Sequence, residues 1–192
     1  MLETLDQVRA DIASRLAYAA DKRKSPMHTP VVATADADAR VMVLRDFSLA
    51  DWTLRFHTDT RAGKVAVIER DPAMGVLFYD KEAKLQIRCR GTGRIERSGP
   101  LADAAWAESD NFVRRCYLGE GPGAVSDGPT SGLPPAFEGV EPTDTEIAPA
   151  RRNFAVLLMR IETADWFHLA HTGHRRAVFD LAAGGEGRWV SP

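Results

Sequence analysis

The sequence predicts an antiparallel β-barrel with accessory helices. Its apolar runs are short, several alternate apolar with polar residues, and turns rather than regular crossover helices join them. The chain lacks the Gly-x-Gly-x-x-Gly element that follows the first strand of a dinucleotide-binding parallel sheet. These observations favour a barrel over a doubly wound parallel sheet. A length of 192 residues is typical of one domain, so we expect residues 1–192 to fold as a single domain.

The first half of the chain predicts one helix and then strands. Apolar residues recur at spacings of three and four over residues 2–18, and a run with two prolines at 21–30 ends this helix. A turn at 36–39 separates the first two strands, and a second helix opens at 59–62 and ends at Asp71-Pro72. The strands expected here are 31–35, 40–45 and 52–58.

The second half predicts more strands, a helix and a long loop. Gly91 and Gly93 indicate a bulge or tight bend within the strand 85–95, and a helix is expected from 101 to about 117. Residues 119–150 hold six of the 11 prolines and six of the 15 glycines, so we expect a Pro/Gly-rich loop that is functional or mobile. The other expected strands are 74–79, 154–161, 165–169, 176–181 and 188–190.

Composition excludes several classes of protein. The 25 basic and 27 acidic residues give a net charge of −2, which argues against a general nucleic-acid binder. No apolar run approaches the ~18–20 residues that span a bilayer, so we expect no membrane partner. The acidic N-terminus lacks the features of a signal peptide. We expect Cys89 and Cys116 to be reduced thiols and the protein to be cytoplasmic.

A group of basic residues indicates an anion site. Arg61 and Lys64 are three residues apart at the start of a predicted helix, so they share a face, and Thr58 precedes them. A helix N-terminus also offers free N–H groups to a phosphate. Arg40 and Arg45 are five apart, so on an ideal strand they face opposite sides. One of these two arginines could complete a phosphate cradle; the alternative is a solvated basic helix start.

An ordered set of motifs resembles the pyridoxamine 5′-phosphate oxidase superfamily of split β-barrel flavoproteins. The set begins with Arg40-Val41-Met42-Val43-Leu44-Arg45 and continues with Phe56-His57-Thr58-Asp59, Lys64 and Asp71-Pro72. A later strand has Gln86 five residues before Gly91, and Trp166 followed by His174-Arg175-Arg176 matches the family's C-terminal pattern. The resemblance covers roughly residues 30–97 and 154–190, and it implies an antiparallel split β-barrel.

The resemblance also implies an FMN at a homodimer interface. Arg40, Arg61 and Lys64 would hold the FMN phosphate, with His57 and Thr58 against the ribityl chain or the phosphate. The backbone of Val41, Met42, Val43 and Leu44 would run beside the isoalloxazine ring, and Arg45 would lie near its pyrimidine edge or the substrate. The residues expected to reach the flavin partly from the second subunit are Gln86, Trp166 and Arg176.

Departures from the family pattern concern the substrate. The family's oxidases carry an Arg-x-His that binds substrate phosphate, and here those two positions are Thr172 and His174. Arg115, Tyr117 and His174 are the candidate substrate residues. We therefore expect a divergent branch rather than the true oxidase: an FMN-dependent oxidoreductase acting on a small substrate or electron donor, with a non-catalytic flavin carrier or sensor as the alternative.

Three histidines at spacings of three invite a metal hypothesis. His168, His171 and His174 would alternate between faces of a strand and would not converge without a bend. No cysteine or carboxylate clusters beside them in sequence. We therefore expect no metal site.

Overall fold

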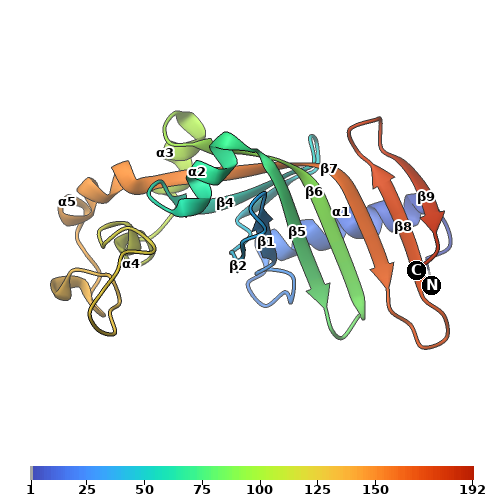
Figure 1. Cartoon of the computed structure of the whole chain (residues 1–192), viewed down its shortest axis with the longest axis horizontal. Coiled ribbons are helices and arrows are strands. Elements are labelled where there is room, and N and C mark those ends of the chain that lie inside the picture. Colours follow the sequence, from blue (N-terminus) through green and yellow to red (C-terminus); the bar gives the residue numbers. More distant parts are fainter. Residues whose placement is uncertain (1) are drawn as a thin grey trace.

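A computed structural model describes residues 2–192 and confirms a mainly antiparallel β architecture (Figure 1). Within this range one nine-stranded sheet has the order β2-β1-β5-β6-β7-β4-β3, with β8 paired to β7 and β9 paired to β8. The strands are β1 (Val31–Thr34), β2 (Ala39–Val41), β3 (Asp46–Ser48), β4 (Thr53–Asp59), β5 (Ala73–Asp80), β6 (Leu85–Glu96), β7 (Phe154–His168), β8 (Arg175–Asp180) and β9 (Glu186–Val190).

Helices lie across the sheet and beyond one end of it. The first helix runs behind β5–β8, whereas α4, α5 and the loop between them lie at the end of the molecule away from β8 and β9 (Figure 1). No helix within residues 2–192 has the length and apolarity to cross a membrane. The α-helices are α1 (Leu5–Asp21), α2 (Gly63–Arg70), α3 (Pro100–Ala107), α4 (Asn111–Arg114) and α5 (Asp144–Ile147), and the 3₁₀ helices are η1 (Arg115–Tyr117), η2 (Pro135–Phe137) and η3 (Ala148–Asn153).

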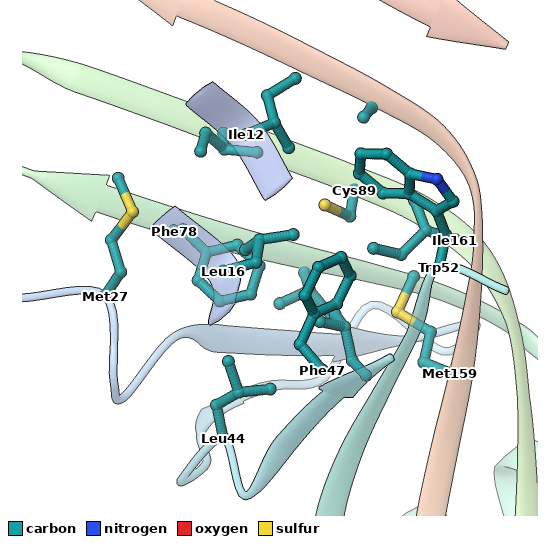
Figure 2. Close-up of a cluster of buried hydrophobic side chains, with 14 of the residues drawn as sticks. Ile12, Leu16, Met27, Leu44, Phe47, Trp52, Phe78, Cys89, Met159 and Ile161 are labelled. Carbon is teal, nitrogen blue, oxygen red and sulfur yellow. The ribbon is translucent and has the colours of Figure 1, made fainter. Parts of the chain in front are cut away.

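The main core forms between α1 and the sheet. Thr4 caps α1 in a capping box with Gln7, which satisfies backbone N–H groups that the first turn leaves free. Ile12 and Leu16, on the buried face of this helix, are fully buried, and they lie close to Phe78 in Figure 2. Burying such a side chain contributes about 1.5–3 kcal/mol to stability. The apolar face of α1 therefore holds the helix against the sheet and covers this side of the core.

Strand β7 connects two parts of the structure. Its first half pairs with β4 and its second half with β8, while β6 runs along most of its length. The side chains of the first half alternate between two cores: Leu157 and Met159 belong to the core under α1, whereas Phe154, Val156 and Leu158 pack with α3 and η1. Burial on both faces explains why this run of the sequence is continuously apolar.

A bulge interrupts the pairing of β6 with β7, which confirms the bend predicted at Gly91. Arg90 pairs with Thr163 and Gly91 pairs with Ile161, so Glu162 is the extra residue on β7. A Cβ at Gly91 would lie 1.9 Å from the carbonyl oxygen of Arg160, closer than any contact allows. Only glycine lets the two backbones approach this closely.

Several sequence expectations differ from the structure. The expected strand 40–45 ends at Val41, and the expected strands 154–161 and 165–169 are one strand, β7. The expected helix 101–117 is three elements, because the carboxylate of Asp110 accepts a hydrogen bond from the N–H of Val113 (3.1 Å) and starts α4 anew. Part of the expected loop 119–150 forms η2, α5 and the start of η3, and the short strand β3 was missed.

Candidate functional site

A pocket of about 330 Å³ forms where the end of β2, the end of β4, the start of α2 and the α4–η1 turn meet. We name it the cationic pocket. It brings together residues that the sequence predicted for one site with others that it did not. Its lining residues are Arg40, Val41, Met42, Val43, Arg45, His57, Thr58, Asp59, Lys64, Val113, Cys116, Tyr117 and Pro122.

The basic side chains of the cationic pocket outnumber the acidic ones. Arg40 donates to Thr34 Oγ1 (3.0 Å) and pairs with the exposed Asp38. Lys64 forms no ion pair within residues 2–192, although it is half-buried. Burial lowers the pKa of Lys64, and the nearby Arg40 lowers it further. An anion beside Lys64 would relieve both effects, so the pocket is suited to a negatively charged group.

Asp59 is the single carboxylate of the cationic pocket, and Arg61 neutralises it. Arg61 donates from Nε to Asp59 Oδ1 (2.9 Å) and from a terminal nitrogen to Oδ2 (2.7 Å). Its other terminal nitrogen donates to the carbonyl of Gly119 (2.9 Å). Arg61 does not line the pocket. This geometry favours Lys64 and Arg40 over Arg61 for holding a phosphate.

The segment after β2 presents its backbone to the cationic pocket. The amides of Met42 and Leu44 donate to the carbonyls of Pro30 (3.1 Å) and His28 (2.9 Å), and the Leu44 side chain is fully buried in the core. Val41, at the end of β2, and Val43, just beyond it, line the pocket, and β2 has no neighbouring strand on its other edge within residues 2–192. This open edge can offer hydrogen bonds to a polar ligand.

Arg40 and Arg45 both line the cationic pocket, so the expectation that they face opposite sides is wrong. Regular alternation requires a continuous strand, and the strand ends at Val41. The Arg45 amide then donates to the carbonyl of Arg55 (2.8 Å), which turns the chain toward β3. The irregular turn therefore brings the second arginine back to the pocket.

His57 and Tyr117 form part of the pocket wall through aromatic contacts. The ring centroids of His57 and Tyr117 lie 5.0 and 5.2 Å from that of Phe154. Burial lowers the pKa of His57 to about 4, with Arg45 and Arg55 adding to the effect, so its imidazole is neutral at neutral pH. Burial raises the pKa of the Tyr117 hydroxyl. Neither side chain carries a charge at neutral pH.

The three residues expected to reach the flavin from a second subunit do not share a face. In the strand register, Phe167 on β7 is directly opposite Gln86 on β6 and Arg176 on β8. Side chains of directly paired residues share a face, and for Gln86 and Arg176 this is the face of the sheet away from α1. Trp166 points the other way: it is 4% exposed in the core, and its Nε1 donates to Asp11 (2.9 Å). None of the three lines the cationic pocket of its own chain. Their contact with a flavin stays a prediction, and the burial of Trp166 does not favour it.

Arg176 lies beside a groove of about 540 Å³ on the sheet face, which we name the sheet-face groove. It donates from Nε and a terminal nitrogen to both oxygens of Asp165 (3.0 and 2.7 Å), and Arg88 pairs with the same carboxylate. Burial alone would raise the pKa of Asp165, but the two arginines outweigh it and lower the pKa. The groove is lined by Val31, Ala33, Gly75, Val76, Leu77, Arg88, Cys89, Arg90, Asp165 and Arg176.

Of the candidate substrate residues, the structure brings only Tyr117 to the cationic pocket. Arg115 donates to the carbonyls of Phe137 (3.1 Å) and Val140 (3.3 Å), so it holds the loop around η2. His174 is exposed in the β7–β8 turn, where it contacts Phe167. Within residues 2–192 no cluster of His, Cys, Asp or Glu could hold a metal ion.

Sequence reasoning missed four residues of the pocket wall, Asp59, Val113, Cys116 and Pro122. Pro122 comes from the Pro/Gly-rich segment, which therefore reaches the pocket. Cys116 lies between Arg115 and Tyr117, which the sequence had singled out, but the expected continuous helix hid the turn that brings Cys116 and Val113 inward. Asp59 is the last residue of the motif Phe56-His57-Thr58-Asp59. Nothing in the sequence indicated that it pairs with Arg61 at the pocket wall.

Comparison with known proteins defines the class of the fold. A pyridoxamine 5′-phosphate oxidase-related, FMN binding protein from Nostoc punctiforme PCC 73102 superposes with a TM-score of 0.72 at 21% identity, covering 99% of this chain and 100% of that chain. PhzG from Burkholderia lata 383, in complex with tetrahydrophenazine-1-carboxylic acid, gives 0.69 at 14% identity, covering 98% and 92%. The chain is thus a split β-barrel of the pyridoxamine 5′-phosphate oxidase type.

Part of the chain also matches a family by sequence. Residues 10–97 match the sequence model of the family described as "Pyridoxamine 5′-phosphate oxidase, FMN-binding domain". With the shared fold, this match confirms the resemblance that the motifs predicted. No curated protein sequence matches the chain significantly.

Proposed function

We propose that this protein binds FMN in the cationic pocket and is an FMN-dependent oxidoreductase acting on a small substrate. The observation that carries the proposal is the placement of Lys64, Arg40 and Thr58 around the start of α2, with Lys64 lacking an ion pair within residues 2–192. A helix N-terminus and two cations favour a phosphate group. The match of residues 10–97 to an FMN-binding family supports the choice of ligand.

The donors of the pocket fit the rest of the cofactor as well. Arg45 and His57 line the pocket on its side away from Lys64's helix, so their side chains would lie beside the ring rather than the phosphate. Val41 and Val43 would offer backbone groups to the polar edge of the ring. Bound FMN supplies reversible hydride and electron transfer, and the charge of Arg45 would stabilise the anionic reduced ring.

We further propose a homodimer in which the sheet-face groove meets a second copy. Gln86 and Arg176 lie on this face, and Val31, which lines the groove, is 37% exposed. Arg176 already binds Asp165 with two of its nitrogens, so its remaining N–H groups would face the partner. We place the protein in the cytoplasm, because Cys89 and Cys116 are free thiols and burial raises the pKa of Cys89 to about 12.

A non-catalytic flavin carrier or sensor is the second candidate. Two observations favour it, because both weaken the expected substrate site. Arg115 donates to a loop carbonyl, and Thr172 stands where the family's oxidases carry a substrate-binding arginine. The two candidates differ in turnover. A flavoprotein that nicotinamide donors and small reductants fail to reduce at a useful rate would support the carrier, whereas steady reduction and reoxidation by oxygen would support the enzyme.

The first experiment is an absorbance spectrum of the purified protein, followed by mass determination of any released cofactor. We expect flavin absorption and the mass of FMN. A colourless protein that remains colourless after incubation with FMN and gel filtration would contradict both candidates.

A further inference from the structure

A second, smaller cavity adjoins the cationic pocket. It encloses about 160 Å³ between β4 and the α3–α4 connection, and we name it the arginine cavity. It shares Arg45, His57 and Val113 with the cationic pocket, so the two spaces meet at these side chains. Its remaining lining residues are Arg23, Arg55, Glu108, Ser109 and Asp110.

Unpartnered nitrogens gather around this cavity. Within residues 2–192, the buried side-chain nitrogens and oxygens without a hydrogen-bond partner are Arg45 Nε, Arg55 Nε and His57 Nε2, and all three belong to residues that line it. The nearest carboxylate to Arg55 Nε, that of Asp46, is 3.9 Å away, beyond hydrogen-bond distance. Buried donors of this kind are rare and costly, and three at one place indicate a missing acceptor.

The side chains that line the arginine cavity have a net positive charge, although two of them are acidic. Arg23, Arg45 and Arg55 face two carboxylates. Glu108 lies 3.6 Å from Arg55, and Asp110 is engaged in capping α4. The ring of His57 is neutral at neutral pH, so its Nε2 can donate in one tautomer. The lining side chains carry one net positive charge, and Asp46, outside the cavity, lies 3.9 Å from Arg55 Nε, so the site suits a singly charged acceptor better than a dianion.

We propose that the arginine cavity binds the carboxylate of the substrate, so that the substrate class is a small organic acid. The inference rests on the proposed function, because it assumes that the rest of the substrate lies in the cationic pocket against a flavin. A carboxylate offers two oxygens to the paired donors of a guanidinium. A phosphate dianion would carry more charge than the cavity balances and would lie close to Glu108 and Asp110.

The test is calorimetric titration of the full-length protein, with and without added FMN, using three probes: benzoate, benzamide and phenyl phosphate. Benzamide has the shape of benzoate without its charge. We expect benzoate to bind at least about tenfold more tightly than benzamide, as a charge-assisted pair allows. Equal affinities would overturn the proposal, and so would tighter binding of phenyl phosphate than of benzoate.

Two substitutions locate the site. Arg55→Gln and Arg23→Gln should each weaken benzoate binding about fivefold or more while leaving benzamide binding unchanged. Lys24→Gln is the control, because Lys24 is exposed, adjacent to Arg23, of the same charge, and lines neither space. The exposed Arg23 tests the site even where Arg55→Gln disturbs folding. Unchanged benzoate affinity in Arg23→Gln and in folded Arg55→Gln would refute the assignment.

FMN affinity, measured in the same preparations, separates the two proposals. FMN binding without a preference for benzoate would overturn the arginine cavity as a carboxylate site and leave the proposed function standing. A preference for benzoate without FMN binding would keep the carboxylate site and overturn the proposed function.

Discussion

Two basic residues three positions apart, Arg61 before α2 and Lys64 in its first turn, differ in what their charges already contact. Arg61 is bound to Asp59 and to the carbonyl of Gly119, so most of its donors are in use. Lys64 has no ion pair within residues 2–192 and lines the cationic pocket. Sequence spacing predicted both on one face, but only the structure distinguishes Lys64, which is without an ion pair in the described residues, from Arg61, which is held by Asp59.

Replacing Lys64 should weaken FMN binding. Lys64→Gln removes one charge-assisted contact, for which we expect a loss of about 1.5–3 kcal/mol in binding free energy. Fluorescence titration of FMN measures it. Lys81→Gln removes the same charge from an exposed turn and should change nothing. Equal affinities for Lys64→Gln and the wild type would refute the phosphate assignment.

Replacing Arg61 should chiefly lower stability. Arg61→Gln removes the charged partner of Asp59, which is 8% exposed and keeps only the backbone N–H of residue 61, so we expect the free energy of unfolding to fall by about 1–3 kcal/mol. Urea unfolding of the FMN-free protein measures this change. A variant with unaltered stability but a loss of FMN affinity as large as that of Lys64→Gln would restore Arg61 to the phosphate site.

His57 makes stability depend on pH. Its pKa falls from 6.5 in the unfolded chain to about 4 in the folded protein, because burial disfavours the imidazolium. Below pH 6.5 the unfolded state therefore binds more protons than the folded state, and stability falls as pH decreases toward 4. We expect this slope, up to about 1.4 kcal/mol per pH unit, to be missing from His57→Gln in urea unfolding. Parallel curves for both proteins would contradict the shift.

At the scale of elements, the alternation of the sequence predicted most of the strands. Hydrophobic alternation does not show where an irregular backbone begins, so the end of β2 at Val41 and the return of Arg45 to the pocket were missed. The expectation of one continuous helix over residues 101–117 concealed the break at Asp110, where a side-chain cap competes with continued helix. The gathering of Thr58 and Lys64 near the start of α2 was predictable from local spacing, whereas the arginine cavity depends on tertiary packing.

The bulge between β6 and β7 depends on Gly91. Gly91→Ala should lower the free energy of unfolding by at least about 2 kcal/mol, because its Cβ would collide with the Arg160 carbonyl. Gly75→Ala on β5 is the matched control: a Cβ there meets nothing within 4 Å, so we expect a change below about 1 kcal/mol. Urea midpoints compare the two, and similar midpoints would show that the strands can separate without cost.

At the scale of the whole molecule, the proposed dimer links assembly to cofactor binding. Leu77→Glu places a charge in the sheet-face groove, so we expect monomers in sedimentation velocity and weaker FMN binding in the same sample. Leu49→Glu is the control, because Leu49 is already 57% exposed and lies outside the groove. A Leu77→Glu protein that remains dimeric would place the interface elsewhere.

The extra residue at Glu162 sets which side chains of β7 lie on the outer face of the sheet and which face the core. Ile161 points into the core, Glu162 and Thr163 are both half-buried, and Ala164 points inward again. Without that insertion the alternation would run on in the opposite phase. Asp165 would then lie under α1 and Trp166 on the outer face. One backbone insertion therefore decides whether an arginine-bound carboxylate or an indole lies on the outer face of the sheet.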